Sequence, residues 1–102
     1  MIVAMPYRQG SLIDWDSATV FVLYHLENNR IIDKELIQPH TSGEALVEFL
    51  YRKQVNRVML TKLNDDLKFN LAFYQIEPII GVAGDTEELM GQFLEGAFEH
   101  DE

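Results

Sequence analysis

The sequence predicts a single three-layer α/β domain over residues 1–102, with helices on both faces of a five-stranded mixed sheet. Three observations predict it: a β-hairpin in the first third of the chain, an alternation of helix and strand patterns after it, and two strands with the residues of sheet edges. The hairpin joins the apolar runs 19–27 and 30–38 through Asn28 and Asn29. Asn tolerates the positive φ of a type I′ turn, so a tight connection is expected.

The first strand is expected at the centre of the sheet and the second hairpin strand at an edge. Residues 1–6 are a continuous apolar run, which is typical of a strand covered on both faces. The run 30–38 carries Asp33, Lys34 and Glu35 at its middle, and charged side chains are a common feature of edge strands.

Capping residues and apolar stripes predict three helices. Thr41 and Glu44 have the spacing of a capping box, Asn64 is placed to cap the second helix, and Asp85 with Glu88 is placed to cap the third. The stripes expected to face the core are Ala45, Leu46, Phe49 and Leu50, then Leu67, Leu71 and Tyr74, then Leu89, Met90, Phe93, Leu94, Ala97 and Phe98.

Two strands between these helices complete the sheet, over residues 57–61 and 76–81. Pro78 removes a hydrogen-bond donor from the second of them, which indicates the opposite edge. Right-handed crossovers then give the order 3-2-1-4-5, counted along the chain, with strand 2 antiparallel to strand 1. The chain leaves strands 1 and 4 in opposite directions, so a crevice is expected beyond their carboxyl ends.

The loops expected at this crevice, residues 7–18, 39–43, 61–64 and 81–85, carry the candidate site residues. Asp14, Asp16 and His40 are candidate metal ligands, because carboxylates suit hard cations and an imidazole suits softer metals. His40, Trp15 and Lys62 are candidates for holding a cofactor, with Lys62 placed to bind an anion at a helix start.

Each of these residues has a structural alternative. Asp14 and Asp16 could form an Asx-turn, which is what loop Asp residues do more often than bind metal. His40 and Lys62 could be solvated side chains. Trp15 could anchor its loop, the role that we favour because large aromatic side chains bury most of their surface.

Four stretches carry a resemblance to a known family: Met1-Ile-Val-Ala-Met-Pro6, the hairpin followed by Asn-Asn-Arg-Ile-Ile, Pro39-His-Thr-Ser-Gly43, and residues 75–88. They resemble the dinitrogenase iron–molybdenum cofactor biosynthesis family, small domains related to nitrogenase accessory and cofactor-carrier proteins. The resemblance covers nearly the whole chain. It implies a single nitrogenase accessory factor-like domain of ribonuclease H-like topology.

The resemblance also implies a non-enzymatic carrier of a metal ion or of an iron–molybdenum or iron–sulfur cluster, with no cofactor required for folding. The metal site is expected to be degenerate. Where the family commonly has His-Phe-Gly-Arg-Ala, this sequence has Asp14-Trp-Asp-Ser-Ala18, so a carboxylate replaces the candidate imidazole. Thr61-Lys-Leu63 stands where the family usually has paired glycines.

Composition limits the remaining function classes. The chain has no cysteine, which excludes thiolate catalysis and Cys-ligated clusters. The net charge of −9 repels phosphate backbones, so no nucleic-acid binding is expected, and the acidic end at residues 95–102 is expected to be solvated. The chain has neither an apolar run of roughly 18 residues nor a basic leader, which predicts no membrane span and a cytoplasmic location.

Two alternatives to the carrier stay open: a metal-free protein-interaction module on the same scaffold, and a metal-dependent nuclease. Two-metal hydrolysis would need several acids on the central strands, and residues 1–6 contain none. Catalysis is not expected, because Ser11, Ser17 and Ser42 lie in no Gly-x-Ser-x-Gly turn and the crevice offers no other recognisable nucleophile.

Overall fold

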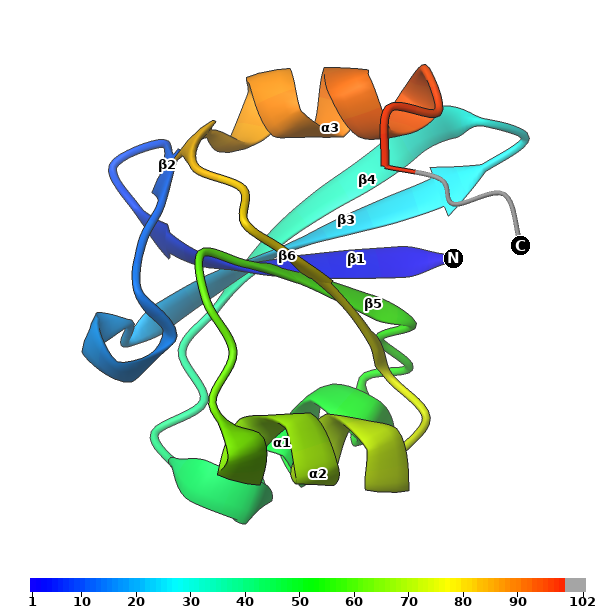
Figure 1. Cartoon of the computed structure of the whole chain (residues 1–102). Helices are drawn as coiled ribbons and strands as arrows, with labels where there is room; N and C mark the ends of the chain where they lie inside the picture. The colour runs from blue at the N-terminus through cyan, green and yellow to red at the C-terminus, as the bar shows by residue number, and fades with distance from the viewer. Residues whose placement is uncertain (99–102) are drawn as a thin grey trace.

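The protein, seen in a computed structural model, is described over residues 1–98; residues 99–102, the end of the acidic tail, lie outside the described part. One sheet lies between two helical layers (Figure 1). The strands are β1 (Ile2–Arg8), β2 (Ser11–Leu12), β3 (Val20–Glu27), β4 (Arg30–Ile37), β5 (Arg57–Leu60), β6 (Glu77–Ile80) and β7 (Gly84–Asp85). The helices are α1 (Gly43–Arg52), α2 (Asp65–Phe73) and α3 (Thr86–Leu94), with a 3-10 turn, η1, at Trp15–Ser17.

The five longer strands lie in the order β4-β3-β1-β5-β6, which is the predicted order. Strand β1 pairs antiparallel with β3 and parallel with β5, and β5 pairs parallel with β6. The charged strand β4 and the Pro78 strand β6 are the two edges of this set, as predicted. Asn28 and Asn29 have φ of 53° and 62°, the positive values that a type I′ turn requires.

The prediction of five strands was wrong, because the sheet has seven. Strand β1 turns back at Gln9 and Gly10, with φ of 50° and 85°, and returns as β2. Strand β2 then pairs with β7, with Ser11 opposite Asp85. The turn was missed because Gln gives little sequence signal for a positive φ.

Helices α1 and α2 cover one face of the sheet and α3 covers the other, as predicted (Figure 1). The first core contains Ala4, Phe21, Leu23, Leu46, Val47, Leu50, Val55, Val58, Leu60, Leu67, Leu71 and Ile76. The second contains Val3, Met5, Leu12, Val22, Tyr24, Leu26, Met59, Ile79, Val82, Leu89 and Met90. The stripes need corrections: Val47 is buried where Ala45 was expected, and Ala97 is exposed. The residues of the stripes that pack on the cores but are only partly buried are Phe49, Tyr74, Phe93, Leu94 and Phe98.

The caps of α2 and α3 form as expected, and that of α1 does not. Asn64 Oδ1 accepts from the Leu67 amide at 2.8 Å, and Asp85 Oδ1 accepts from two amides of α3. The N-cap of α1 is Ser42, whose side chain makes no capping bond. With Ser42 as N-cap, Glu44 is the second helical residue and not the third, so the capping box cannot close.

All three helices end in the same Schellman pattern, with one left-handed residue after the C-cap. These residues are Gln54, Gln75 and Gly96, with φ of 69°, 59° and 82°. In α2 the Gln75 amide donates to the Ala72 carbonyl at 3.1 Å and the Ile76 amide to the Leu71 carbonyl at 2.9 Å. Glycine is the usual residue at this position, so two of the three ends are strained.

We expect Gln75→Gly to raise the free energy of unfolding by about 1 kcal/mol, because glycine avoids the cost of the left-handed conformation. Urea unfolding measures the change. The matched control is Gly96→Gln, which places the strained residue at the end of α3 and should lower stability by a similar amount. A loss of stability in Gln75→Gly would contradict this account of the helix end.

Candidate functional site

Two small hollows lie at the crevice end of the sheet. One, of about 200 Å³, has residues of the η1 turn and of the starts of α1 and α2 in its wall. Its lining residues are Trp15, Asp16, Gly43, Asn64, Asp66, Leu67 and Asn70. The other, of about 220 Å³, is lined by Ala18, Thr19, Phe21, Gln38, Pro39, His40 and Thr41. Loops that are distant in sequence therefore meet at this end, as the topology predicted.

Trp15 and Phe21 join the walls of the two hollows. Their rings meet edge to face, with 5.2 Å between centroids and 74° between planes. Trp15 is half-buried against the core beneath α1 and α2. The indole therefore anchors the η1 turn on the core and leaves one part of its surface in the wall of a hollow.

The structure does not bring Asp14, Asp16 and His40 together. Asp16 lies on the smaller hollow and His40 on the other, where His40 has a left-handed φ of 56°. Over residues 1–98, no group of three or more His, Asp or Glu side chains is close enough to hold a metal ion. The predicted ligand set is therefore not preformed.

The Asx-turn alternative is not formed either. Asp14 is the N-cap of η1, but its side chain makes no capping bond, and the turn is closed by the Ser17 amide on the Asp14 carbonyl at 3.1 Å. Lys62 is exposed between β5 and α2 and lines neither hollow. In the described part of the chain, every buried side-chain nitrogen or oxygen has a hydrogen-bond partner, so no buried polar atom there is left free for a ligand.

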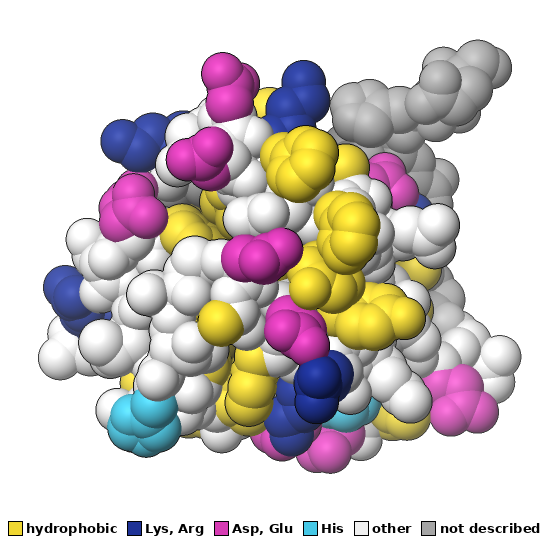
Figure 2. All heavy atoms as spheres, turned by 90° about the horizontal axis from the view of Figure 1, so that it is seen from below, with side chains coloured by type: hydrophobic (Ala, Val, Ile, Leu, Met, Phe, Trp, Pro, Cys, Tyr) yellow, Lys and Arg dark blue, Asp and Glu magenta, His cyan; other side chains and the backbone are white. Residues whose placement is uncertain are grey.

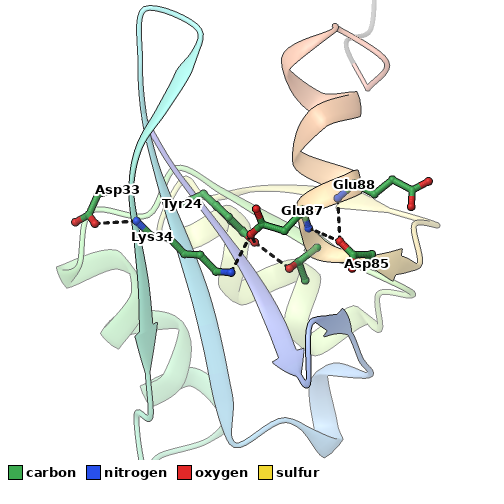
Figure 3. Close-up of polar contacts among 7 residues, drawn as sticks. Tyr24, Asp33, Lys34, Asp85, Glu87 and Glu88 are labelled. Carbon is green, nitrogen blue, oxygen red and sulfur yellow. Dashed lines mark hydrogen bonds and ion pairs between the residues drawn. The ribbon is translucent and has the colours of Figure 1, made fainter.

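A polar cluster that sequence reasoning missed lies on the opposite face of the sheet, between β3, β4 and α3 (Figure 3). The fully buried Tyr24 donates its hydroxyl proton to Glu87 Oε2 at 2.6 Å. Its oxygen lies 2.9 Å from Thr86 Oγ1, and because the tyrosyl proton is already used, the Thr86 hydroxyl is the donor of that bond. Lys34 Nζ lies 2.8 Å from the same Glu87 oxygen.

The pKa shifts in this cluster keep every proton in place at neutral pH. Burial, then the bond to Glu87, raises the pKa of Tyr24 to about 12. The bond from Lys34, then that from Tyr24, lowers the pKa of the Glu87 carboxyl. A general acid or base works best with a pKa near the operating pH, so these shifts suit a structural connection between the edge strand and α3.

Two further hollows lie away from the crevice. The larger, of about 400 Å³, is at the other end of β1, and its lining residues are Met1, Leu26, Glu27, Asn28, Asn29, Arg57 and Phe93. In its wall Arg57 lies over the Phe93 ring, 5.7 Å from the centroid, and 3.6 Å from Glu77. The second, of about 350 Å³, is lined by Tyr51, Phe73, Tyr74 and Gln75 at the ends of α1 and α2. Across residues 1–98, no helix is long and apolar enough to cross a membrane.

Solved structures of other proteins share this arrangement. The protein PH0822 matches 99% of this chain and 96% of its own length with a TM-score of 0.89, at 18% sequence identity. The chain has the same fold. A Methanocaldococcus jannaschii protein named "putative dinitrogenase" matches with a TM-score of 0.74 at 15% identity, over 94% of this chain and 89% of its own. A Thermotoga protein named "putative NifB protein" matches with a TM-score of 0.73 at 19% identity, over 93% of this chain and 88% of its own. No protein-family model and no curated protein matches.

Proposed function

We propose that this chain is a non-enzymatic protein-interaction module, related to nitrogenase accessory proteins and built on a ribonuclease H-like sheet. The observation that carries the proposal is an exposed cluster of aromatic side chains on the outer side of α1 and α2. Tyr51, Phe69 and Phe73 are 54%, 69% and 66% exposed. Soluble monomers rarely expose large contiguous apolar patches unless the patch binds something.

The cluster forms one continuous surface, called here the aromatic face: Tyr51, Phe69, Phe73 and Tyr74. The Tyr74 ring lies 5.3 Å from that of Tyr51 and 5.0 Å from that of Phe73, measured between centroids. Tyr51, Phe73 and Tyr74 line the hollow of about 350 Å³ together with Gln75. Figure 2 looks onto this side of the molecule and shows the hydrophobic side chains gathered in one patch. Such a patch with a central hollow suits an apolar anchor of a partner protein.

The aromatic face could have been found in the sequence. Leu67 and Leu71 define the buried side of α2, while Phe69 and Phe73 are also four residues apart and lie on its other side. A second apolar stripe on a helix whose first stripe is buried indicates a surface with a second use.

A metal-dependent nuclease and a binder of nucleic acid or membranes receive less support. Strands β1 and β5 contain no acid, and Glu27 at the end of β3 is the single acid of the three inner strands, so these strands offer no two-metal nuclease site. The net charge of −9 supports the absence of nucleic acid and of anionic membranes among the partners. The proposal places the protein in the cytoplasm.

Selection of peptides from a random library displayed on phage tests the proposal. The wild-type protein is the target and a Phe69→Ser/Phe73→Ser variant is the counter-target; because both side chains are exposed, the variant should fold, which circular dichroism checks. We expect enriched peptides that bind the wild type at least about tenfold more tightly than the variant. No enrichment, or equal binding to both proteins, would contradict an interaction module that works through this face.

The names of two similar structures favour a second candidate, a metal or cluster carrier that uses the crevice. Its ligands would be Asp14, Asp16 and His40, which would have to move together on binding.

We expect calorimetric titration with Mn²⁺, Fe²⁺ and Zn²⁺ at neutral pH to give no saturable heat that depends on His40, because its hollow holds no second ligand side chain. His40→Ala and Asp14→Asn are the comparison variants. Saturable binding by the wild type that is lost in both variants would favour the carrier.

A further inference from the structure

We propose that the partner segment bound by the aromatic face carries apolar side chains at one end and Lys or Arg side chains at the other. The inference rests on the proposed function and adds the chemistry and the direction of the partner.

The direction follows from the parallel course of α1 and α2. Each helix begins after a strand that ends at the crevice, so both run away from the crevice along the same face of the sheet (Figure 1). Their starts meet at the hollow that Gly43 and Asn64 line, and their ends meet at the contact between Tyr51 and Tyr74. The two-helix surface therefore has a crevice end and an aromatic end.

The crevice end of this surface has a net negative charge, because three carboxylates there exceed two exposed lysines, Lys62 before α2 and Lys68 in its second turn. Glu44 lies in the first turn of α1, and Asp65 and Asp66 lie in the first turn of α2, all three exposed. None of the three has an ion-pair partner within residues 1–98. Arg52, the basic residue of α1, is held by Glu48 at 2.7 Å. In Figure 2 both acidic and basic side chains lie beside the hydrophobic patch.

The carboxylates of the crevice end and the aromatic end are close enough for one short peptide to reach both. Asp65 and Phe73 are eight residues apart in one helix, which at 1.5 Å per residue places them about 12 Å from each other along its axis. Burial, then the charges of Glu48 and Glu44, raise the pKa of Tyr74, while the charge of Arg52 lowers it, so carboxylates of α1 act on the aromatic end. A peptide of a few residues can contact both ends at once.

The negative charge of the protein favours a basic partner at the aromatic face. A second copy of this chain would bring another −9 to the face, and nucleic acid or an anionic lipid surface would also be repelled. A segment with basic side chains beside an apolar anchor gains contact energy from the hollow and attraction from the three carboxylates.

Fluorescence polarisation with two labelled peptides tests the inference. The first peptide has lysines at one end and leucines and a tryptophan at the other, and the second has glutamates in place of the lysines. We expect the basic peptide to bind, the acidic one not to bind, and Asp65→Asn/Asp66→Asn to weaken binding of the basic peptide about tenfold. The matched control is Glu27→Gln/Glu95→Gln, which removes the same charge from exposed positions outside α1 and α2 and should leave binding within about twofold.

The outcomes separate this inference from the function on which it rests. If phage selection yields peptides that need Phe69 and Phe73 but have no excess of Lys or Arg, the inference is wrong and the interaction module stands. If no peptide binds the aromatic face, both are wrong. If sedimentation shows a dimer that Phe69→Ser/Phe73→Ser dissociates, the occupant is a second copy, and the inference is also wrong.

Discussion

Phe21→Ala is expected to lower the free energy of unfolding by about 3–5 kcal/mol, the cost of removing a large aromatic side chain from a packed core. Phe21 is 1% exposed and lies in the core that α1 and α2 cover, where its ring meets that of Trp15 edge to face. Its loss leaves a cavity beneath the η1 turn and removes the support of the indole. The change would use a large part of the roughly 5–15 kcal/mol that stabilises a domain of this size.

Phe69→Ala is the matched control, because it makes the same chemical change at a side chain that is 69% exposed. We expect its effect to stay within about 0.5 kcal/mol, and that of the partly buried Phe93→Ala to fall between the two. Urea unfolding of the three variants gives the order. A cost for Phe69→Ala as large as that for Phe21→Ala would show that the aromatic face stabilises the fold, and it would remove the basis of the interaction proposal.

The parts of the fold that were predictable from the sequence depend on signals within a few residues. The hairpin follows from Asn28-Asn29, the caps of α2 and α3 from Asn64 and Asp85, and the edge β6 from Pro78. Once the edges are known, the handedness of crossovers leaves few orders for the strands.

The pairing of β2 with β7 was not predictable in the same way. Both strands have two residues, and Ser11 pairs with Asp85 across more than seventy positions of the chain. No periodicity can appear in so short a segment. The pairing is produced by the tertiary arrangement, which brings the start of α3 beside the turn between β1 and β2. There the Thr86 amide donates to the Gly10 carbonyl.

The candidate site was also predictable from the sequence only in part. Topology predicted which loops meet at the crevice, and loops 7–18, 39–43 and 61–64 contribute to its two hollows. Loop 81–85 lines neither hollow and contacts the first loop through the β2–β7 pair. Which hollow each side chain faces depends on the η1 turn and on the left-handed His40, and neither has a sequence signature that fixes its geometry. The ligand set of Asp14, Asp16 and His40 therefore could be proposed from the sequence, and its separation could be seen only in three dimensions.

Tyr24→Phe is expected to lower the free energy of unfolding by about 2–3 kcal/mol while leaving the ring packed. The change removes the proton acceptor of the fully buried Thr86 hydroxyl and one donor to Glu87, and the buried hydroxyl then lacks a partner. Thr86→Val removes that hydroxyl. The double variant Tyr24→Phe/Thr86→Val should therefore lose less stability than the sum of the two single variants, and strict additivity would show that the two groups are not coupled.

The same residue should make stability fall at high pH. The pKa of Tyr24 is about 12 in the folded protein, against an ordinary value of about 10, so the folded state keeps the proton more tightly than the unfolded state. Its contribution is fully present below about pH 10 and is lost as pH rises toward about 12. The free energy of unfolding, measured across this pH range, should decline more steeply in the wild type than in Tyr24→Phe, because the variant lacks the hydroxyl that titrates. Parallel curves would contradict the buried hydrogen bond from Tyr24 to Glu87, because a tyrosine with free access to water has the same pKa in both states.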